Sequence, residues 1–142
     1  MQTSARNQFK GIVKDIQIGA VNAEVHLSLP GGDTIVATIS KDSIDNLNLK
    51  AGLEVIALVK APQIIIVTDF GGYRLSARNQ LAGTVTAIKS GAVNSEIDIE
   101  LKGGELVAAT ITNESAEFLG LSIGKVATAV FKAGAVILAV AK

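Results

Sequence analysis

The chain has 142 residues, no cysteine, and thirteen basic against thirteen acidic residues, so its formal net charge is zero. The absence of cysteine excludes disulfides and thiolate metal sites. The balanced charge argues against long-range attraction to nucleic acid or to an anionic membrane. The first residues lack the apolar run of a signal peptide, and no apolar stretch reaches the length of a membrane span, which predicts a cytoplasmic protein.

The chain contains a duplication with a constant offset of 72 residues. The segment Ser-Ala-Arg-Asn-Gln at residues 4–8 recurs at residues 76–80, and Gly-Ala-Val-Asn at residues 19–22 recurs at residues 91–94. Aligning residues 4–61 with residues 76–133 needs no gap and leaves 26 of 58 positions identical, which shared strand composition alone does not produce. Two copies are too few for a solenoid, so we interpret them as two small domains, residues 1–68 and residues 75–142, joined by a linker at residues 69–74.

Each copy predicts the same order of elements. Alternating apolar and polar residues, many of them β-branched, predict strands at residues 9–17, 23–29, 34–39, 54–60 and 63–68. In the second copy the last two strands are expected at residues 126–132 and 135–140. After the third strand the apolar spacing changes, which predicts a short helix that begins at the cap Ser40 and ends at the Ala51-Gly52 turn. Gly11, inside the first strand, predicts a bulge or a sharp bend there.

Five strands with a short helix between the third and the fourth are the element order of an OB-type Greek-key barrel. The predicted fold class is therefore all-β, with two tandem OB-type five-stranded Greek-key barrels. Because the linker is short, we expect the two barrels to lie close together.

The sequence offers little catalytic chemistry. His26 is the only histidine, and Asp98 takes its place in the second copy. His26 lies on the polar face of an alternating strand, which predicts a solvated side chain. With this one histidine on a polar strand face and no cysteine, no Ser-His-Asp, Cys-His or zinc constellation can be built. The sequence therefore predicts a protein that is not an enzyme and that holds neither a cofactor nor a metal cation.

The polar residues that the two copies share are mainly hydrogen-bond donors. Arg6 and Arg78 supply guanidinium groups, and Lys60 and Lys132 supply ammonium groups at strand ends. The hydroxyl and amide groups of the set belong to Ser4, Ser40, Ser43, Ser76, Thr112, Ser115, Asn7, Asn22, Asn79 and Asn94. A set rich in donors and poor in carboxylates suits a small anion and not a metal cation. Serine and asparagine also recur in turns for backbone reasons, so the arginines and lysines carry most of this argument.

The combination of these motifs resembles the Mop domain, a molybdate-binding domain, over nearly the whole chain and twice. The resemblance rests on Ser-Ala-Arg-Asn-Gln, Gly-Ala-Val-Asn, Thr38-Ile39-Ser40 with Ser43, and Lys60-Ala61-Pro62. It implies a tandem Mop-domain protein whose OB-type barrels assemble as a homotrimer around a threefold axis. Such a protein is expected to bind molybdate or tungstate between subunits and to serve molybdenum storage or homeostasis.

The resemblance assigns the oxyanion sites to matching residues of the two copies. In the first copy these are Ser4, Arg6, Asn7, Ser40, Ser43, Lys60 and Ala61, and in the second copy Ser76, Arg78, Asn79, Thr112, Ser115, Lys132 and Ala133. A further anion site on the threefold axis is expected at the turns formed by Gly19, Ala20, Val21 and Asn22 and by Gly91, Ala92, Val93 and Asn94. Thr112 in place of Ser40 keeps a hydroxyl, whereas Gly134 in place of Pro62 removes a rigid ring.

Two other functions stay open at this point. OB-type barrels often bind single-stranded nucleic acid, but this use needs a basic groove with stacking aromatics. The chain has zero net charge and only four phenylalanines and one tyrosine, which counts against it. The other alternative is an accessory protein that binds pterin or the molybdenum cofactor. The expected partners are small oxyanions and further copies of the chain, with neither nucleic acid nor membrane.

Overall fold

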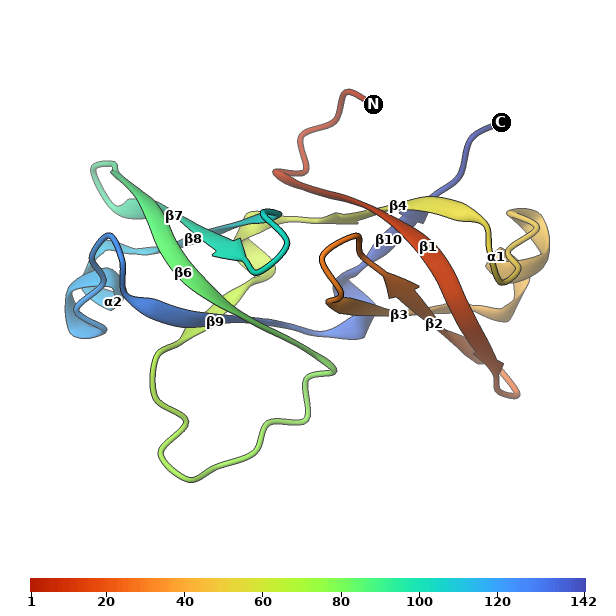
Figure 1. The fold of residues 1–142 in the computed structure, drawn as a ribbon, viewed down its shortest axis with the longest axis horizontal. Helices are drawn as coiled ribbons and strands as arrows, with labels where there is room; N and C mark the ends of the chain where they lie inside the picture. Colours follow the sequence, from red (N-terminus) through yellow and green to blue (C-terminus); the bar gives the residue numbers. More distant parts are fainter.

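The computed structural model describes residues 1–142 and contains ten strands, two short α-helices and two 3₁₀ turns. The first half comprises β1 (Asn7–Ile18), β2 (Asn22–Ser28), β3 (Thr34–Ser40), α1 (Lys41–Asn46), β4 (Glu54–Val59), the 3₁₀ turn η1 (Ala61–Gln63) and β5 (Ile65–Val67). The second half comprises β6 (Asn79–Ser90), β7 (Asn94–Leu101), β8 (Leu106–Thr112), α2 (Asn113–Phe118), β9 (Val126–Phe131), the 3₁₀ turn η2 (Ala133–Ala135) and β10 (Ile137–Ala139). Figure 1 shows two lobes side by side, with α1 and α2 at opposite ends of the long axis. The structure confirms the all-β class with two five-stranded antiparallel sheets.

Side-chain alternation along the strands builds the core of each lobe. In β2 and the residue after it, Val25, Leu27 and Leu29 are buried, whereas Glu24 and His26, one residue out of phase, lie on the outer face. β7 repeats the pattern, with Ile97, Ile99 and Leu101 buried. The inward residues of both halves join into one apolar cluster of 27 residues. None of the helices is long and apolar enough to cross a membrane.

Each long first strand contains a bulge, but the bulge lies beyond the glycine that predicted it. β1 changes register with β2 between Val13 and Asp15, which leaves Lys14 as the extra residue. β6 does the same between Val85 and Ala87. The extra residue restores the inward orientation of apolar side chains along a strand of twelve residues. The predicted bulge at Gly11 is therefore wrong in position, and Gly11 instead lies close to β2, where a Cβ would come within 3.1 Å of the Ser28 carbonyl oxygen.

The helices end earlier than the glycine turns that were expected to end them. α1 ends at Asn46, and Asn48 has a positive φ of 52° that turns the chain away. The Leu49 amide then donates to the Ile44 carbonyl at 3.0 Å, as in a Schellman-type helix end. Gly120, with φ of 61°, takes the same role after α2. The Ala51-Gly52 turn is a separate feature that leads into β4.

The last strand of each half pairs with the sheet of the other half. β10 pairs with β4, so the first sheet has the order β10-β4-β1-β2-β3. β5 pairs with β9, so the second sheet has the order β5-β9-β6-β7-β8. Figure 1 shows β10, in blue, beside β4 in the lobe that the first half otherwise forms. The expectation that residues 1–68 and residues 75–142 would each supply all five strands of one barrel is therefore wrong.

The two 3₁₀ turns explain the exchange. η1 follows β4 directly and packs against β8, and η2 follows β9 and packs against β3. The chain thus leaves its own barrel at the end of the fourth strand and crosses to the other. There Ile64, Ile66, Val136 and Leu138 are buried in the shared core. Burial of an aliphatic side chain of this size stabilises by roughly 1.5–3 kcal/mol, so the exchanged segments hold the two lobes together.

The hairpin loops also meet between the lobes. A Cβ added to Gly31, in the β2–β3 loop, would lie 2.3 Å from the Cα of Gly103, in the β7–β8 loop. The reverse contact has the same length. Only glycine permits so close a backbone approach, so both copies need a glycine at this place.

The strand exchange predicts which engineered cysteines can form a disulfide. Ala57 of β4 lies directly opposite Leu138 of β10, and residues paired in this way lie within disulfide range. Because the chain has no native cysteine, Ala57→Cys with Leu138→Cys should oxidise to one intramolecular disulfide. Peptide mapping by mass spectrometry under non-reducing conditions would detect it.

The matched control is Ala57→Cys with Ile66→Cys, the pair that would be adjacent if each half kept its own fifth strand. This control should stay reduced, because Ile66 pairs with Ala129 of the other sheet. A disulfide in the control and none in the first pair would overturn the exchanged topology.

Candidate functional site

Residues 4–8 and residues 76–80 form the opening segment of each half. Asn7 and Asn79 attach these opening segments to the opposite barrel. Asn79 Oδ1 accepts a hydrogen bond from the Val36 amide, and its Nδ2 donates to the Val36 carbonyl, both at 2.8 Å. Asn7 makes the same pair of bonds with Ala108, at 2.7 and 2.9 Å, and also donates to the Val59 carbonyl at 3.1 Å. Each side chain therefore pairs with β3 or β8 as a strand residue would. With 1% and 0% of their surface exposed, these amides cannot meet a ligand directly.

Arg6 and Arg78 are each held by a glutamate from the opposite half. Arg78 Nη1 donates to Glu24 Oε2 of β2 at 2.6 Å, and Arg6 Nη2 pairs with Glu96 of β7. The arginine side chains are still 52% and 56% exposed. Because a guanidinium group has five N–H donors and the glutamate takes one of them, most of each fork is available to a further anion.

His26 belongs to the same cluster as Arg78. Its Nε2 lies 2.7 Å from Glu24 Oε1, and its Nδ1 lies 3.8 Å from Asp15 Oδ1. The hydrogen bond with His26 is the main cause that lowers the pKa of Glu24 below its ordinary value of 4.5; burial opposes the shift and Arg78 adds to it. The side chain of His26 is only 19% exposed, so the expectation of a solvated histidine is wrong.

The predicted hydroxyls form the N-caps of the two helices. Ser40 Oγ accepts from the Ser43 amide at 3.2 Å, and the two hydroxyl oxygens lie 2.8 Å apart. Thr112 and Ser115 repeat this arrangement at 3.1 and 2.8 Å. These hydroxyls therefore have a structural role in the helix caps. Ser40, Thr112 and Ser115 are also exposed, so their oxygens can meet a ligand at the same time.

The Gly-Ala-Val-Asn turns lie beside these caps. The Val21 carbonyl accepts from the Lys41 amide in the first turn of α1 at 3.1 Å, and the Val93 carbonyl accepts from the Asn113 amide at 2.9 Å. Both turns are closed in the same way, by a bond of 2.9 Å from Gly19 N to the Asn22 carbonyl and one of 2.8 Å from Gly91 N to the Asn94 carbonyl. The residues assigned to a separate axial site are thus next to the helix-cap residues of the same half.

The Lys-Ala segments lie against the opposite half. Ala61 and Ala133 are buried where η1 packs on β8 and η2 on β3. A pocket of about 580 Å³ brings Pro62 together with residues of the second half, among them Asn94, Thr110, Thr112 and Ser115. Lys60 and Lys132 are exposed at the start of these turns, and neither takes part in an ion pair. The two turns have nearly the same backbone angles at their first residue, so Gly134 adds a backbone N–H that Pro62 lacks without changing the turn.

We group the residues around these contacts into two composite sites, each drawn from both halves. The first contains Arg6, Asn7, Lys60 and Ala61 from the first half with Asn94, Glu96, Thr112 and Ser115 from the second. The second is its counterpart by the repeat and groups Arg78, Asn79, Lys132 and Ala133 with Asn22, Glu24, Ser40 and Ser43. Within one chain, these contacts join residues of the two halves, because β5 and β10 exchange barrels. The grouping predicted from the resemblance lies between chains and stays a prediction. Ser4 and Ser76 are exposed and make no side-chain hydrogen bond within the chain.

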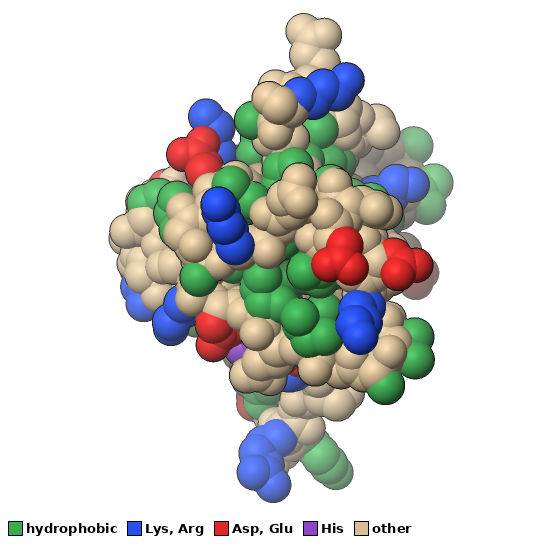
Figure 2. All heavy atoms as spheres, turned by 90° about the vertical axis from the view of Figure 1, so that its right-hand side faces the viewer, with side chains coloured by type: hydrophobic (Ala, Val, Ile, Leu, Met, Phe, Trp, Pro, Cys, Tyr) green, Lys and Arg blue, Asp and Glu red, His purple; other side chains and the backbone are tan.

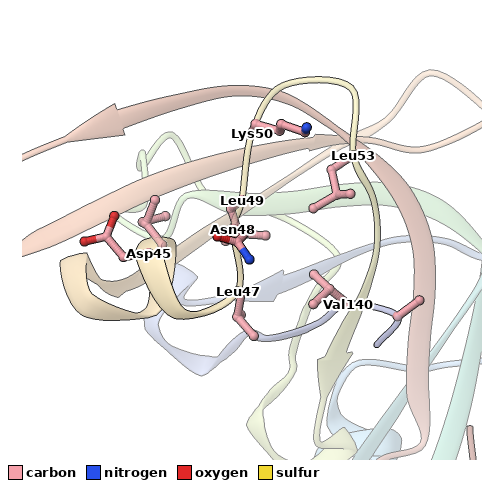
Figure 3. A pocket seen from close by; sticks show the side chains of 9 residues that line it. Asp45, Leu47, Asn48, Leu49, Lys50, Leu53 and Val140 are labelled. Atoms are coloured by element: carbon pink, nitrogen blue, oxygen red, sulfur yellow. The ribbon is translucent and has the colours of Figure 1, made fainter.

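Another pocket, of about 800 Å³, lies away from these residues. Figure 3 shows Leu47 and Leu49 after α1, Leu53 before β4, and Val140 of the C-terminal segment around it. The face at this end of the molecule carries basic and acidic side chains dispersed around a central group of hydrophobic ones (Figure 2). None of the predicted anion-binding residues lines this pocket.

Reasoning from the sequence missed the glutamates of the composite sites. Glu24 and Glu96 occupy equivalent positions, so the signal that identified the arginines was present for them too. They were passed over because a small anion does not need carboxylates. No group of three or more histidine, cysteine, aspartate or glutamate side chains is arranged to hold a metal ion.

The sequence matches the TOBE domain family at residues 3–66 and again at residues 75–138. The chain belongs to the TOBE-domain family. Its fold is that of the cytoplasmic molybdate-binding protein ModG, solved with molybdate bound, at a TM-score of 0.97 and 50% identity. That match covers 99% of this chain and 100% of the ModG chain. The resemblance to tandem Mop-domain proteins is confirmed by these findings.

Longer and shorter relatives match as well. The molybdenum transport protein ModE of Herbaspirillum seropedicae is 45% identical over 140 residues, and the molybdenum-pterin-binding protein MopA of Rhodobacter capsulatus is 43% identical over 139 residues. The match covers 99% and 98% of this chain, but the two TOBE repeats span only about half the length of these relatives, 52% in each case. Molybdenum-pterin-binding protein 3 of Clostridium pasteurianum is 45% identical over 67 residues, which is 47% of this chain and 98% of that protein.

The buried asparagines make a stability prediction. We expect Asn79→Ala to lower the free energy of unfolding by about 1–3 kcal/mol, because it leaves the N–H and C=O groups of buried Val36 without partners. Denaturant titration of the purified protein measures this loss. Asn46→Ala, at an exposed position in α1 without a side-chain hydrogen bond, is the control and should change stability by less than about 0.5 kcal/mol. Equal losses in the two variants would show that the bonds to β3 contribute nothing.

Proposed function

We propose that this protein binds molybdate, and tungstate, at its two composite sites, without catalysis and without a cofactor. The observation that carries the proposal is that the half-exposed arginine of each TOBE repeat lies against a glutamate of the other repeat and keeps most of its N–H donors free. The similarity to ModG, a molybdate-binding protein of the same length and fold, supports the choice of anion.

The roles of the residues follow from their geometry. Arg6 with Lys60, and Arg78 with Lys132, supply the exposed cationic donors. Ser4 and Ser76 supply hydroxyls from the opening segments, and the helix caps supply Thr112 and Ser115 at the first site and Ser40 and Ser43 at the second. Asn7 and Asn79 hold the opening segments in place, and Ala61 and Ala133 fix the position of the lysines beside them.

The chemistry of the anion fits such a set. Molybdate is a tetrahedral dianion with four acceptor oxygens, and it needs donors but no general acid or base. Charge-assisted hydrogen bonds from guanidinium and ammonium groups are stronger than neutral ones. Sulfate has the same charge but shorter bonds, so a rigid set of donors placed for the larger anion leaves some of them out of reach.

Assembly as a homotrimer would complete the sites between chains. Four apolar side chains at equivalent positions of the two TOBE repeats are mostly exposed: Val21, Val93, Ile65 and Ile137. Ile65 and Ile137 lie on β5 and β10, which are edge strands of the two sheets. An apolar edge strand favours association with another chain. Val21 and Val93 belong to the Gly-Ala-Val-Asn turns, where an axial anion site at Gly19–Asn22 and Gly91–Asn94 would form around the threefold axis.

The biological role proposed is storage of molybdenum or maintenance of its homeostasis in the cytoplasm. Anion release is then governed by the anion concentration and by assembly, since a ligand held between chains stabilises the assembled state. The names of MopA and of the Clostridium pasteurianum relative favour a second candidate, binding of a molybdenum pterin. Pterin absorbance in the purified protein would distinguish it from binding of the free oxyanion.

Replacement of both arginines tests the site. We expect Arg6→Ala with Arg78→Ala to weaken molybdate binding by roughly 10- to 100-fold, because each lost charge-assisted hydrogen bond contributes about 1.5–3 kcal/mol. Isothermal titration calorimetry with sodium molybdate gives the affinity and the stoichiometry.

Arg74→Ala is the control, because Arg74 is an exposed arginine of the linker that makes no ion pair. It should bind as the unmodified protein does. No heat from the unmodified, folded protein with molybdate or tungstate would refute the proposed function, and unchanged binding by the double variant would remove the arginines from the site.

The oligomeric state is a separate prediction. Light scattering coupled to size-exclusion chromatography should give three times the chain mass of 14.6 kDa. Ile65→Lys with Ile137→Lys should reduce this mass, because charge on the two apolar edge strands opposes association. Ile12→Lys should not, because its equivalent, Thr84, is already polar. A monomer in the unmodified protein would contradict the assembly.

A further inference from the structure

The two composite sites differ in the residues behind their arginines. At the second site Arg78 is bound by Glu24, Glu24 is hydrogen-bonded to His26, and His26 faces Asp15. At the first site Arg6 is bound by Glu96, but Asp98 and Ala87 stand at the positions of His26 and Asp15. The arginine and the glutamate are repeated, whereas the histidine occurs once in the chain.

We propose that His26, acting through Glu24 on Arg78, is a positioning residue that makes anion binding at the Arg78 site tighten as the pH falls, while the Arg6 site is insensitive to pH in the same range. This inference rests on the proposed function, since it concerns the strength of oxyanion binding at the same arginine.

The first step of the argument is the charge of the cluster. With His26 neutral, Arg78, Glu24 and Asp15 carry a formal net charge of −1. A proton on His26 brings the sum to zero and lowers the repulsion that a dianion meets on approach to Arg78. It also gives the imidazole two N–H donors, which face Glu24 Oε1 and Asp15 Oδ1 at 2.7 and 3.8 Å. The pull of His26 on Glu24 then competes with the bond from Glu24 to Arg78 and leaves the guanidinium freer for the anion.

The second step is that no other histidine faces this cluster. On β3, Val36 lies opposite His26 and Thr38 opposite Glu24. On β1, Gln17 lies opposite Glu24, Asp15 opposite His26, and Lys14 is the exposed bulge residue. His26 is the one histidine among these residues, and histidine is the side-chain type that can change charge near neutral pH.

The third step is the contrast with the first site. Lys89 lies opposite Glu96, so Arg6, Lys89, Glu96 and Asp98 sum to zero without a histidine. None of these four groups is a histidine, the side-chain type whose ordinary charge change lies nearest neutral pH. The Arg6 site therefore serves as an internal control, because the formal charge around this arginine does not depend on a histidine.

The test uses two variants, each of which keeps only one of the two site arginines, Arg78 or Arg6. Molybdate is titrated by calorimetry between about pH 6 and about pH 8, the range in which an ordinary histidine changes charge. Arg6→Ala, which keeps the Arg78 site, should bind roughly three- to tenfold more tightly at the lower pH, the effect of one charge on a dianion about 10 Å away in a largely aqueous surrounding. Arg78→Ala, which keeps the Arg6 site, should show no such change.

Exchange of residues between the TOBE repeats separates the proposed effect from a general loss of structure. His26→Asp in the Arg6→Ala protein should abolish the pH dependence, and Asp98→His in the Arg78→Ala protein should create it. A flat profile for Arg6→Ala, or a profile that His26→Asp leaves unchanged, would overturn the inference.

A second measurement tests the reverse effect, that of molybdate on proton binding by His26. The single histidine gives one set of imidazole NMR signals, and a proton that favours anion binding must itself bind more tightly in the complex. Saturation with molybdate should therefore raise the pKa of His26, and no change in that pKa would count against the relay. If the unmodified protein binds no molybdate at any pH, the proposed function fails and this inference fails with it; binding without pH dependence refutes the inference alone.

Discussion

Exchange of the fifth strands is the constraint on which the rest of the structure depends. The free edge of β4 is covered by β10 and that of β9 by β5, in each case a strand of the other half. This happens because η1 and η2 direct the chain to the opposite lobe. Four buried aliphatic side chains accompany the exchange, so separation of the lobes exposes core surface from both. Two halves that complete each other in this way cannot be treated as independent folding units. The pairing of β10 with β4 also joins segments about 80 residues apart, a contact of high sequence separation that slows folding.

The same crossing determines where the polar residues meet. Lys60 stands where the chain leaves one barrel, and the segment after it lies on the helix cap of the other. Asn7, bonded to both Val59 and Ala108, fixes the opening segment to the two barrels at once. The N–H and C=O groups at the edge of a sheet need hydrogen-bond partners when they are buried. A buried amide side chain pairs with them almost as another strand would. The arginine that precedes each asparagine is thereby carried to a glutamate of the opposite half, and the site is a consequence of the topology.

Much of this could be predicted from the sequence, and the failures have a common cause. Strand positions followed from the alternation of apolar and polar residues. Ser40 was identified as a helix cap because local chemistry determines where a helix starts. The bulge at Lys14 also had a local signal, since the apolar residues Val13 and Ile16 are three positions apart and not two. The prediction was placed at Gly11 instead because glycine often marks a bulge. Which barrel receives β5 could not be predicted, because both halves carry nearly the same strand and either pairing satisfies the pattern. The contacts of Arg6 and Arg78 with glutamates of the opposite half could not be predicted for the same reason: spacing within a repeat says nothing about exchange between repeats.

A duplicated chain also separates what the fold requires from what one site requires. Glycines that meet in the hairpin loops, the bonded asparagines and the paired arginine and glutamate occur in both halves, because both lobes use them in the same contacts. Pro62 against Gly134 and His26 against Asp98 differ, although the backbone around them does not. Such differences change hydrogen-bond donors and charge at the composite sites without changing their scaffold. Each arginine lies in one repeat and the glutamate bonded to it in the other. A change in either repeat would therefore act on the proposed anion site of the partner repeat. Under the proposed function, two sites of different strength in one chain would extend the range of anion concentration over which the protein responds, which identical repeats would not achieve.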